Sequence, residues 1–276
     1  MNNVVVRSIS GVVFILAMLA CLMFNKFLFA GLIIFIMSVM LLEFYHITMG
    51  NSYTFSKVLA IIAAIFLFGL LFATASYHIP IRFVAFEMVP IFIVMINSLY
   101  VKDKDEYGKF SNIYTGLLYI AVPIALSNLI AFDKAGNFSG NLLLCFFIII
   151  WCSDVGAFAF GISLGKIFPQ KLFPSVSPKK TWIGFIGGLV SSVLAAFALY
   201  EFGILKFPLI HCLILSFIMS VTGVYGDLFE SQWKRVYGVK DSGKIIPGHG
   251  GFLDRFDSTL MAMPFGAIYL AIFDLL

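Results

Sequence analysis

Residues 204–258 read ILKFPLIHCLILSFIMSVTGVYGDLFESQWKRVYGVKDSGKIIPGHGGFLDRFDS, an apolar run followed directly by a charged segment. The apolar run, residues 204–227, can cross the ~30 Å hydrocarbon core of a bilayer as a helix, since a crossing takes roughly 17–25 residues. The charged segment, Asp227 to Ser258, holds five cations, five acids and one histidine in a chain that is only 12% charged. Polar groups kept beside a bilayer are costly, so this cluster is a candidate functional site.

The composition places the whole chain in the membrane class. Of its 276 residues 61% are hydrophobic, whereas soluble domains are nearer 45–50%. Further apolar runs lie near 7–25, 27–47, 57–77, 81–100, 112–132, 141–165, 182–201 and 256–276. We therefore predict an all-α, polytopic integral membrane protein with about nine transmembrane helices. The net charge of +4 is modest, so no nucleic acid is expected as a partner.

The distribution of Lys and Arg predicts the orientation, because cytoplasmic loops carry the excess. With the N-terminus inside, only Lys26, Arg82, Lys134 and Lys206 of the 18 Lys and Arg lie on the other side. An odd number of spans then puts the C-terminus outside and the charged segments in the cytoplasm.

The chemistry is concentrated in the second half of the chain. We expect residues 1–140 to be scaffold, lipid cavity or subunit contact, and residues 141–276 to be the catalytic transmembrane region. Glu43 and Glu87 are the exceptions in the first half, and each is interpreted as a paired or interfacial acid rather than a catalytic one. A transporter or channel is an alternative of another class, but the repeated halves typical of transporters are not evident.

A first polar segment precedes the charged one. Asp154 lies twelve residues before Lys166, about 18 Å inside the predicted span at ~1.5 Å per residue. Such a carboxylate needs a cation or a polar cavity, and a structural pair with a lysine remains the alternative. The glycine pairs 161/165 and 184/188 predict close packing of the two spans that flank the segment.

Between those two spans, residues 174–181 read PSVSPKKT. Ser177, Lys179, Lys180 and the start of a helix at Thr181 provide hydroxyl, ammonium and N–H groups that suit a phosphate. A positive-inside topology signal is the alternative interpretation of the two lysines.

The charged segment has the character of a metal and phosphate site. Asp254 and Asp257 are three residues apart, so on a helix they share a face. Two such carboxylates can hold Mg²⁺, whereas placement at a helix N-terminus alone would explain only one of them. His249 stands among glycines and is interpreted as a metal ligand or a structural donor ahead of a base.

These residues resemble the phosphatidate cytidylyltransferase (CDP-diacylglycerol synthase) family. The family signature S-x-x-K-R-x4-K-D-x2-K-x2-P-G-H-G-G-x2-D-R-x-D is matched here by Ser231, Lys234, Arg235, Lys240, Asp241, Lys244, Pro247, Gly248, His249, Gly250, Gly251, Asp254, Arg255 and Asp257. Residues 177–181 resemble the family's S-P-K-K-T. One departure is Ile183, where the family usually has an acid.

The resemblance implies transfer of CMP from CTP to phosphatidic acid, giving CDP-diacylglycerol and pyrophosphate in a bacterial plasma membrane. A CTP-dependent lipid kinase is an alternative, and a homodimer is left open. Mg²⁺ is the expected cofactor, and a second cation is left open. We assign the metal to Asp227, Asp254 and Asp257, with Asp154 and Asp241 as further candidates, and catalysis to the same three acids with Lys240 and Arg255. The substrate phosphates are assigned to Ser177, Lys179, Lys180, Lys234, Arg235, Lys244, His249 and Gly250.

Overall fold

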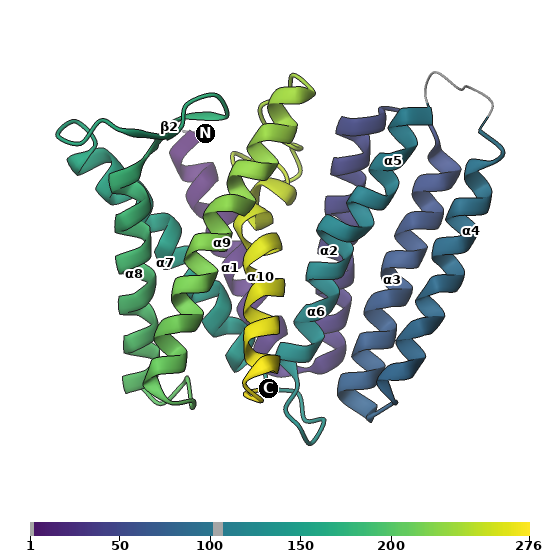
Figure 1. The fold of residues 1–276 in the computed structure, drawn as a ribbon, viewed down its shortest axis with the longest axis horizontal. Coiled ribbons are helices and arrows are strands. Elements are labelled where there is room, and N and C mark those ends of the chain that lie inside the picture. Colours follow the sequence, from purple (N-terminus) through teal and green to yellow (C-terminus); the bar gives the residue numbers. More distant parts are fainter. Residues whose placement is uncertain (1–2, 102–106) are drawn as a thin grey trace. The chain divides into compact units, whose positions relative to one another are not determined.

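The structure is a computed structural model that describes residues 3–101 and 107–276 (Figure 1). The described chain forms nine helical runs and one short β-hairpin. This confirms the predicted all-α polytopic membrane fold. A helix satisfies all its own backbone N–H and C=O groups, which an apolar segment in lipid requires. The side chains of Arg7, Lys102 and Lys104, counted for the orientation, lie outside the described set.

The chain divides into two compact units, the first comprising Met1–Ser139 and Val239–Arg255, the second Gly140–Gly238 and Phe256–Leu276. The first unit contains α1 (Asn3–Phe24), α2 (Lys26–Met49), α3 (Thr54–Tyr77), the 3₁₀ segment η1 (Ile81–Glu87) with α4 (Met88–Ser98), and α5 (Tyr107–Gly116), which continues through the π-helical η2 (Leu117–Ala121) into α6 (Val122–Ala131). The second contains α7 (Asn141–Leu164), β1 (Lys171–Phe173), β2 (Ser177–Thr181), α8 (Trp182–Glu201) and α9 (Leu209–Val236). The helix α10 (Leu253–Ile272) begins in the first unit and continues in the second.

Seven of the helical runs are long and apolar enough to cross a membrane. The other two are α1, whose side chains are described over the apolar stretch Ile9–Phe24, and α10, whose first turns carry three charged residues. The crossing of these two helices stays a prediction.

The helix α9 is longer than predicted. It runs to Val236 instead of ending near residue 227, and it starts after Pro208. Its 28 residues span about 42 Å, which exceeds the hydrocarbon core. The polar last turns remain helical because Glu230 and Lys234 pair at i,i+4 and because Lys234 and Arg235 suit the negative end of the helix dipole.

Residues 171–181 form a hairpin where a loop was predicted. The strands β1 and β2 are antiparallel, with Lys171 opposite Thr181 and Phe173 opposite Ser177. Figure 1 shows this hairpin at the end of the second unit where α7 ends and α8 begins. Lys179 and Lys180 therefore lie on the ordered backbone of β2.

The predicted close packing of residues 141–165 against 182–201 is confirmed for three of the four glycines. A Cβ on Gly184 would lie 2.9 Å from the carbonyl oxygen of Ala157, and one on Gly188 would lie 2.8 Å from that of Ser153. Gly161 in turn lies against Gly184. Gly165 caps α7 and meets its own chain at Gly161 rather than α8.

Candidate active site

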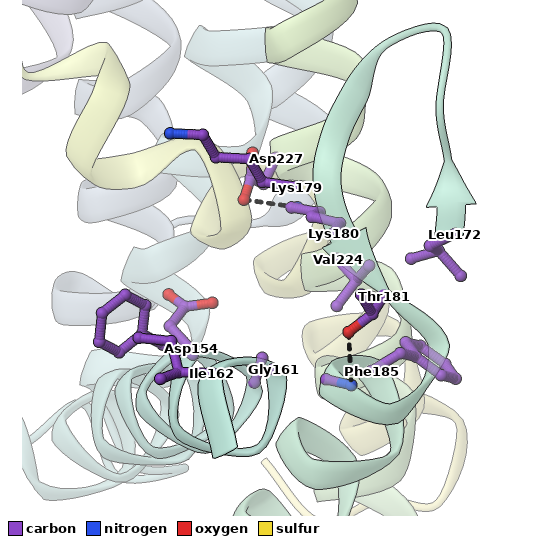
Figure 2. Close-up of a pocket in the computed structure, with 13 residues that line it drawn as sticks. Asp154, Gly161, Ile162, Leu172, Lys179, Lys180, Thr181, Phe185, Val224 and Asp227 are labelled. Carbon is purple, nitrogen blue, oxygen red and sulfur yellow. Dashed lines mark hydrogen bonds and ion pairs between the residues drawn. The ribbon is translucent and has the colours of Figure 1, made fainter. Parts of the chain in front are cut away.

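A cavity of about 510 Å³ lies within the second unit (Figure 2). Its walls come from α7, the hairpin, α8 and α9. The polar lining consists of Asp154, Lys179, Lys180, Thr181 and Asp227. The apolar lining consists of Ala157, Phe158, Ile162, Leu172, Phe185 and Val224, with Gly161 and Gly184 between the helices. One cavity therefore offers both charged groups and apolar surface.

One cation and one acid of this cavity form an ion pair. The Nζ of Lys180 lies 2.6 Å from Oδ2 of Asp227, which joins the hairpin to α9 (Figure 2). The hydroxyl of Ser231, one turn further along α9, donates to Oδ1 of Asp227 at 3.2 Å. Both side chains of the ion pair are only about a quarter to a third exposed, 26% and 30%. The pair sets the position of Lys180 beside Lys179.

Thr181 begins α8 and sets the direction of the hairpin. Its Oγ1 accepts a hydrogen bond from the N–H of Gly184 at 3.2 Å, as an N-cap residue does (Figure 2). The predicted helix start after the two lysines is confirmed. Ile183, the departure from the signature, lies in the first turn of α8.

Four carboxylates of the second unit influence one another electrostatically. The charges of Asp227, Glu230 and Asp154 all act on Asp257. Asp227 is neutralised by Lys180, and Glu230, which is buried, is neutralised by Lys234. The hydroxyl of Ser258 donates to Oδ1 of Asp154 at 3.4 Å. The group is rich in negative charge and so suits a cation.

The donor chemistry of this group fits Mg²⁺, which takes oxygen ligands and uses one or two carboxylates together with waters and substrate phosphates. A cage made by the protein alone is not formed: across residues 3–101 and 107–276, no three His, Cys, Asp or Glu side chains come close enough to hold a metal ion. Asp227 and Asp257 belong to one unit, where a Cβ on Gly226 would lie 2.5 Å from the backbone oxygen of Asp257. The metal assignment stays a prediction.

The first unit holds a second polar cluster around the start of α10. Oδ2 of Asp254 accepts hydrogen bonds from the N–H of Ser242 at 2.8 Å, the hydroxyl of Ser242 at 2.9 Å and the N–H of Gly251 at 2.9 Å. Glu43, from the C-terminal half of α2, accepts from the N–H of Phe252 at 3.1 Å and of Leu253 at 2.9 Å. Asp254, predicted as a metal ligand, therefore also organises this loop.

His249 is held by the N-terminal part of α1. The hydroxyl of Ser10 donates to the carbonyl oxygen of Pro247 at 2.9 Å and lies 2.9 Å from Nδ1 of His249. Since a hydroxyl has a single proton, the Nδ1–H of His249 must be the donor to Ser10. The other ring nitrogen, Nε2, then carries a lone pair, as a metal ligand or a hydrogen-bond acceptor requires.

The structure brings Asp154, Lys179, Lys180 and Asp227 together at the cavity, while the other predicted residues are spread over both units. Ser177, Lys234, Arg235 and Asp257 belong to the second unit, and Lys240, Asp241, Lys244, His249, Gly250, Asp254 and Arg255 belong to the first. Arg235, Lys240, Asp241, Lys244 and Arg255 are exposed. Their roles stay predictions.

Sequence reasoning did not assign Ser10 and Ser242 to the site. Neither carries a local signal, because a serine in a membrane helix or a loop is ordinary. Glu43 was noted as an acid in an apolar run and interpreted as paired, and its partners are the hydroxyl of Ser242 and two backbone N–H groups.

The fold and the cavity define a polytopic helical membrane protein whose helices and hairpin enclose a cavity lined by lysines, aspartates and apolar side chains. The chain belongs to the cytidylyltransferase family, whose model matches residues 5–273. It is 41% identical over 182 residues to the phosphatidate cytidylyltransferase of Bacillus subtilis, which covers 65% of this chain and 63% of that protein. It is 45% identical over 124 residues to that of Staphylococcus saprophyticus, covering 45% and 46% of the two chains. The chain thus aligns with less than two thirds of the length of these relatives.

Proposed function

We propose that this protein transfers CMP from CTP to phosphatidic acid, giving CDP-diacylglycerol and pyrophosphate. The observation that carries the proposal is the cavity that combines Lys179, Lys180 and Asp227 with apolar walls on transmembrane helices. A nucleoside triphosphate needs the charged lining, and a phospholipid needs both the charged lining and the apolar walls. Family membership and the activity named for the relatives support the same reaction.

The reaction needs little acid–base chemistry. A phosphomonoester oxygen of phosphatidate is already anionic, so it can attack the α-phosphorus of CTP directly. A new P–O bond forms there, the bond to the oxygen bridging to the β-phosphorus breaks, and pyrophosphate leaves with the electron pair. The work of the protein is to align the two anions and to stabilise the developing charge.

We assign these tasks to the residues of the cavity. Lys179 and Lys180 bind phosphate oxygens, and their position is fixed by the hairpin and by the N-cap of α8. Asp227 and Asp257 would hold Mg²⁺, with Asp254 retained as a predicted third ligand. When bound, Mg²⁺ neutralises the triphosphate and the pyrophosphate formed from it.

We also propose that the N-terminus and the site are cytoplasmic and that the C-terminus is outside, in a bacterial plasma membrane. The support is the distribution of Lys and Arg. Contacts of Ser10 and Glu43 with residues 242–253 agree, since within the first unit they gather the start of α1 and the end of α2 at one polar end. A homodimer stays a prediction.

The test uses purified protein in detergent with phosphatidate, Mg²⁺ and CTP labelled at either the α- or the γ-phosphate. The proposal expects α-label in the lipid product and γ-label in pyrophosphate. Transfer of γ-label to the lipid would identify a lipid kinase instead. Solute flux in liposomes without consumption of CTP would support a transporter or channel and would contradict the proposal.

A further inference from the structure

We propose that Glu43, on α2, is a positioning residue for the reaction, acting through the loop 241–252 and the first turn of α10. The inference rests on the proposed function for its kinetic consequence. Its structural basis is independent of that function and lies in contacts that all belong to the first unit.

Glu43 caps α10 from another helix. Its Oε1 accepts from the N–H of Phe252 at 3.1 Å, and its Oε2 accepts from the N–H of Leu253 at 2.9 Å. Leu253 is the first residue of α10 and Phe252 is the residue before it, so neither N–H group can find a partner within the helix. A carboxylate there is also favoured by the positive end of the helix dipole. The acid is buried, 6% exposed, so these contacts are shielded from water.

Ser242 connects Glu43 to a predicted metal ligand. Its hydroxyl lies 3.2 Å from Oε2 of Glu43 and 2.9 Å from Oδ2 of Asp254. The N–H of Asp254 donates back to the same hydroxyl at 3.3 Å. Residues 43, 242 and 254 are thus one hydrogen-bonded network, although nearly two hundred residues separate the first two.

Two glycines make room for this carboxylate. A Cβ built on Gly243 would collide with Oε1 of Glu43, and one on Gly251 would collide with both of its oxygens. Neither glycine has a positive φ, so backbone conformation does not require glycine at these positions. Their role is to let Glu43 approach, which indicates that the loop is shaped around this acid.

The consequence for chemistry is positional. Asp254 and Arg255 lie in the first turn of α10, within the first unit, so the capping contacts of Glu43 set where that helix starts and which way these two side chains face. Loss of a residue that hydrogen-bonds to a metal ligand typically changes activity or metal affinity by about 10- to 100-fold.

The experiment compares Glu43→Gln with the wild type. Glutamine keeps the shape but replaces one acceptor oxygen by a donor NH₂, which opposes the N–H group of either Phe252 or Leu253. We expect kcat to fall about 10- to 100-fold, with a smaller change in KM for CTP and a higher Mg²⁺ requirement. Hydrogen exchange at the amides of residues 252 and 253 should accelerate. Glu87→Gln, another buried acid of the first unit, is the matched control and should leave kcat and this exchange unchanged.

A double-mutant cycle tests the contact itself. Gly243→Ala should lower kcat in the wild type but not in Glu43→Ala, where the colliding carboxylate is gone. The inference would be overturned if the losses of kcat caused by Gly243→Ala and by Glu43→Ala multiplied in the double variant. It would also be overturned if Glu43→Gln kept the wild-type kcat and the wild-type hydrogen exchange. Wild-type protein that makes no CDP-diacylglycerol would instead contradict the proposed function, and exchange at residues 252 and 253 would still decide the role of Glu43.

Discussion

Asp257 is surrounded by charges of its own sign. Asp227, Glu230 and Asp154 all repel it, and the two lysines that neutralise part of this group pair with Asp227 and Glu230. Such a group of like charges lowers the stability of the protein without a bound cation but favours cation binding. Loss of stability at a functional site is common in active sites.

Asp257→Asn should therefore separate stability from activity. Burial and the neighbouring charges both disfavour the ionised carboxylate, so replacing it with a neutral amide should raise the midpoint of thermal unfolding without Mg²⁺ by about 2–4 °C, as about 1 kcal/mol would in a protein of this size. Turnover of CTP should fall by at least about 100-fold, the usual cost of losing a group that stabilises the transition state. Thermal unfolding in detergent and the α-label assay measure the two effects.

Asp133→Asn is the control, for which we expect the opposite change in stability. The N–H of Asn137, its side-chain amide and the N–H of Ala135 donate to this carboxylate and hold the pKa of Asp133 below its ordinary value of 3.8. The stabilisation of the folded protein by this carboxylate is present above pH 3.8 and is lost as the pH falls through the lowered pKa. Asp133→Asn should lower stability and keep activity. A fall in stability for Asp257→Asn as well would contradict the repulsion argument.

Ser10 should matter through His249. Ser10→Ala removes the acceptor for the Nδ1–H of His249, so the ring is no longer held in one tautomer, and we expect kcat to fall about 10-fold. Ser10→Thr, which keeps the hydroxyl, should restore most of the rate. Ser38→Ala removes a hydroxyl that bonds only to Ile34 of its own helix in the described contacts, and it should have no effect. Equal rates for Ser10→Ala and wild type would exclude this role.

At the scale of elements, the tight packing of α7 against α8 fixes the walls of the cavity. Both helices contribute lining residues, and Gly188 and Gly184 allow their backbones to approach. The hairpin between them carries the two lysines. A small displacement of α8 would therefore move Thr181 and Lys180 together.

Gly188→Ala should weaken this packing. The added Cβ would lie 2.8 Å from the carbonyl oxygen of Ser153, so α8 must shift, at a cost of about 1–3 kcal/mol. We expect a lower thermal midpoint and lower turnover together. Gly69→Ala in α3 meets nothing within 4 Å and should leave both unchanged or slightly raise the stability. The packing argument fails if both variants behave alike.

The sequence predicted the helices well because long apolar runs in lipid have few alternatives. It placed the start of α8 correctly from Thr181, since an N-cap is a local signal. It missed the extension of α9 to Val236, because the polar turns after residue 227 lack an apolar pattern although their charge pairs support a helix. It also missed the hairpin, whose five-residue strand contains Pro178 and two lysines.

The site was only partly predictable, because local sequence signals name residue types but not the contacts between distant residues. Lys179, Lys180 and Asp227 could be named from residue type and spacing, and the structure places all three at one cavity. The contacts of Glu43 with Ser242 and of Ser10 with Pro247 join residues 199 and 237 positions apart. No local pattern encodes such contacts, which depend on how the helices pack.

At the scale of the whole molecule, the number of membrane crossings decides on which side each terminus lies. Seven runs satisfy the requirements for a span, and α1 and α10 complete the predicted nine. The charge distribution predicts the N-terminus inside and the C-terminus outside.

Reporter fusions test this topology. A fluorescent protein that folds only in the cytoplasm should be bright at the N-terminus and dark at the C-terminus, and a phosphatase active only outside should give the reverse pattern. A fusion at residue 137, in the loop before α7, should report outside, and a fusion at Gly238 should report inside. A cytoplasmic C-terminus would mean an even number of crossings and would exclude the nine-span topology.

The ion pair between Lys180 and Asp227 has a consequence for selectivity. A free anion such as inorganic phosphate can engage Lys180 only by leaving the Asp227 carboxylate without its counter-charge in a partly buried place. A nucleotide that arrives with its own cation exchanges both partners at once, so neither group is left uncompensated. We therefore expect the Lys180–Asp227 pair to disfavour binding of small free anions relative to a nucleotide that carries its own cation, which an unpaired lysine would not do.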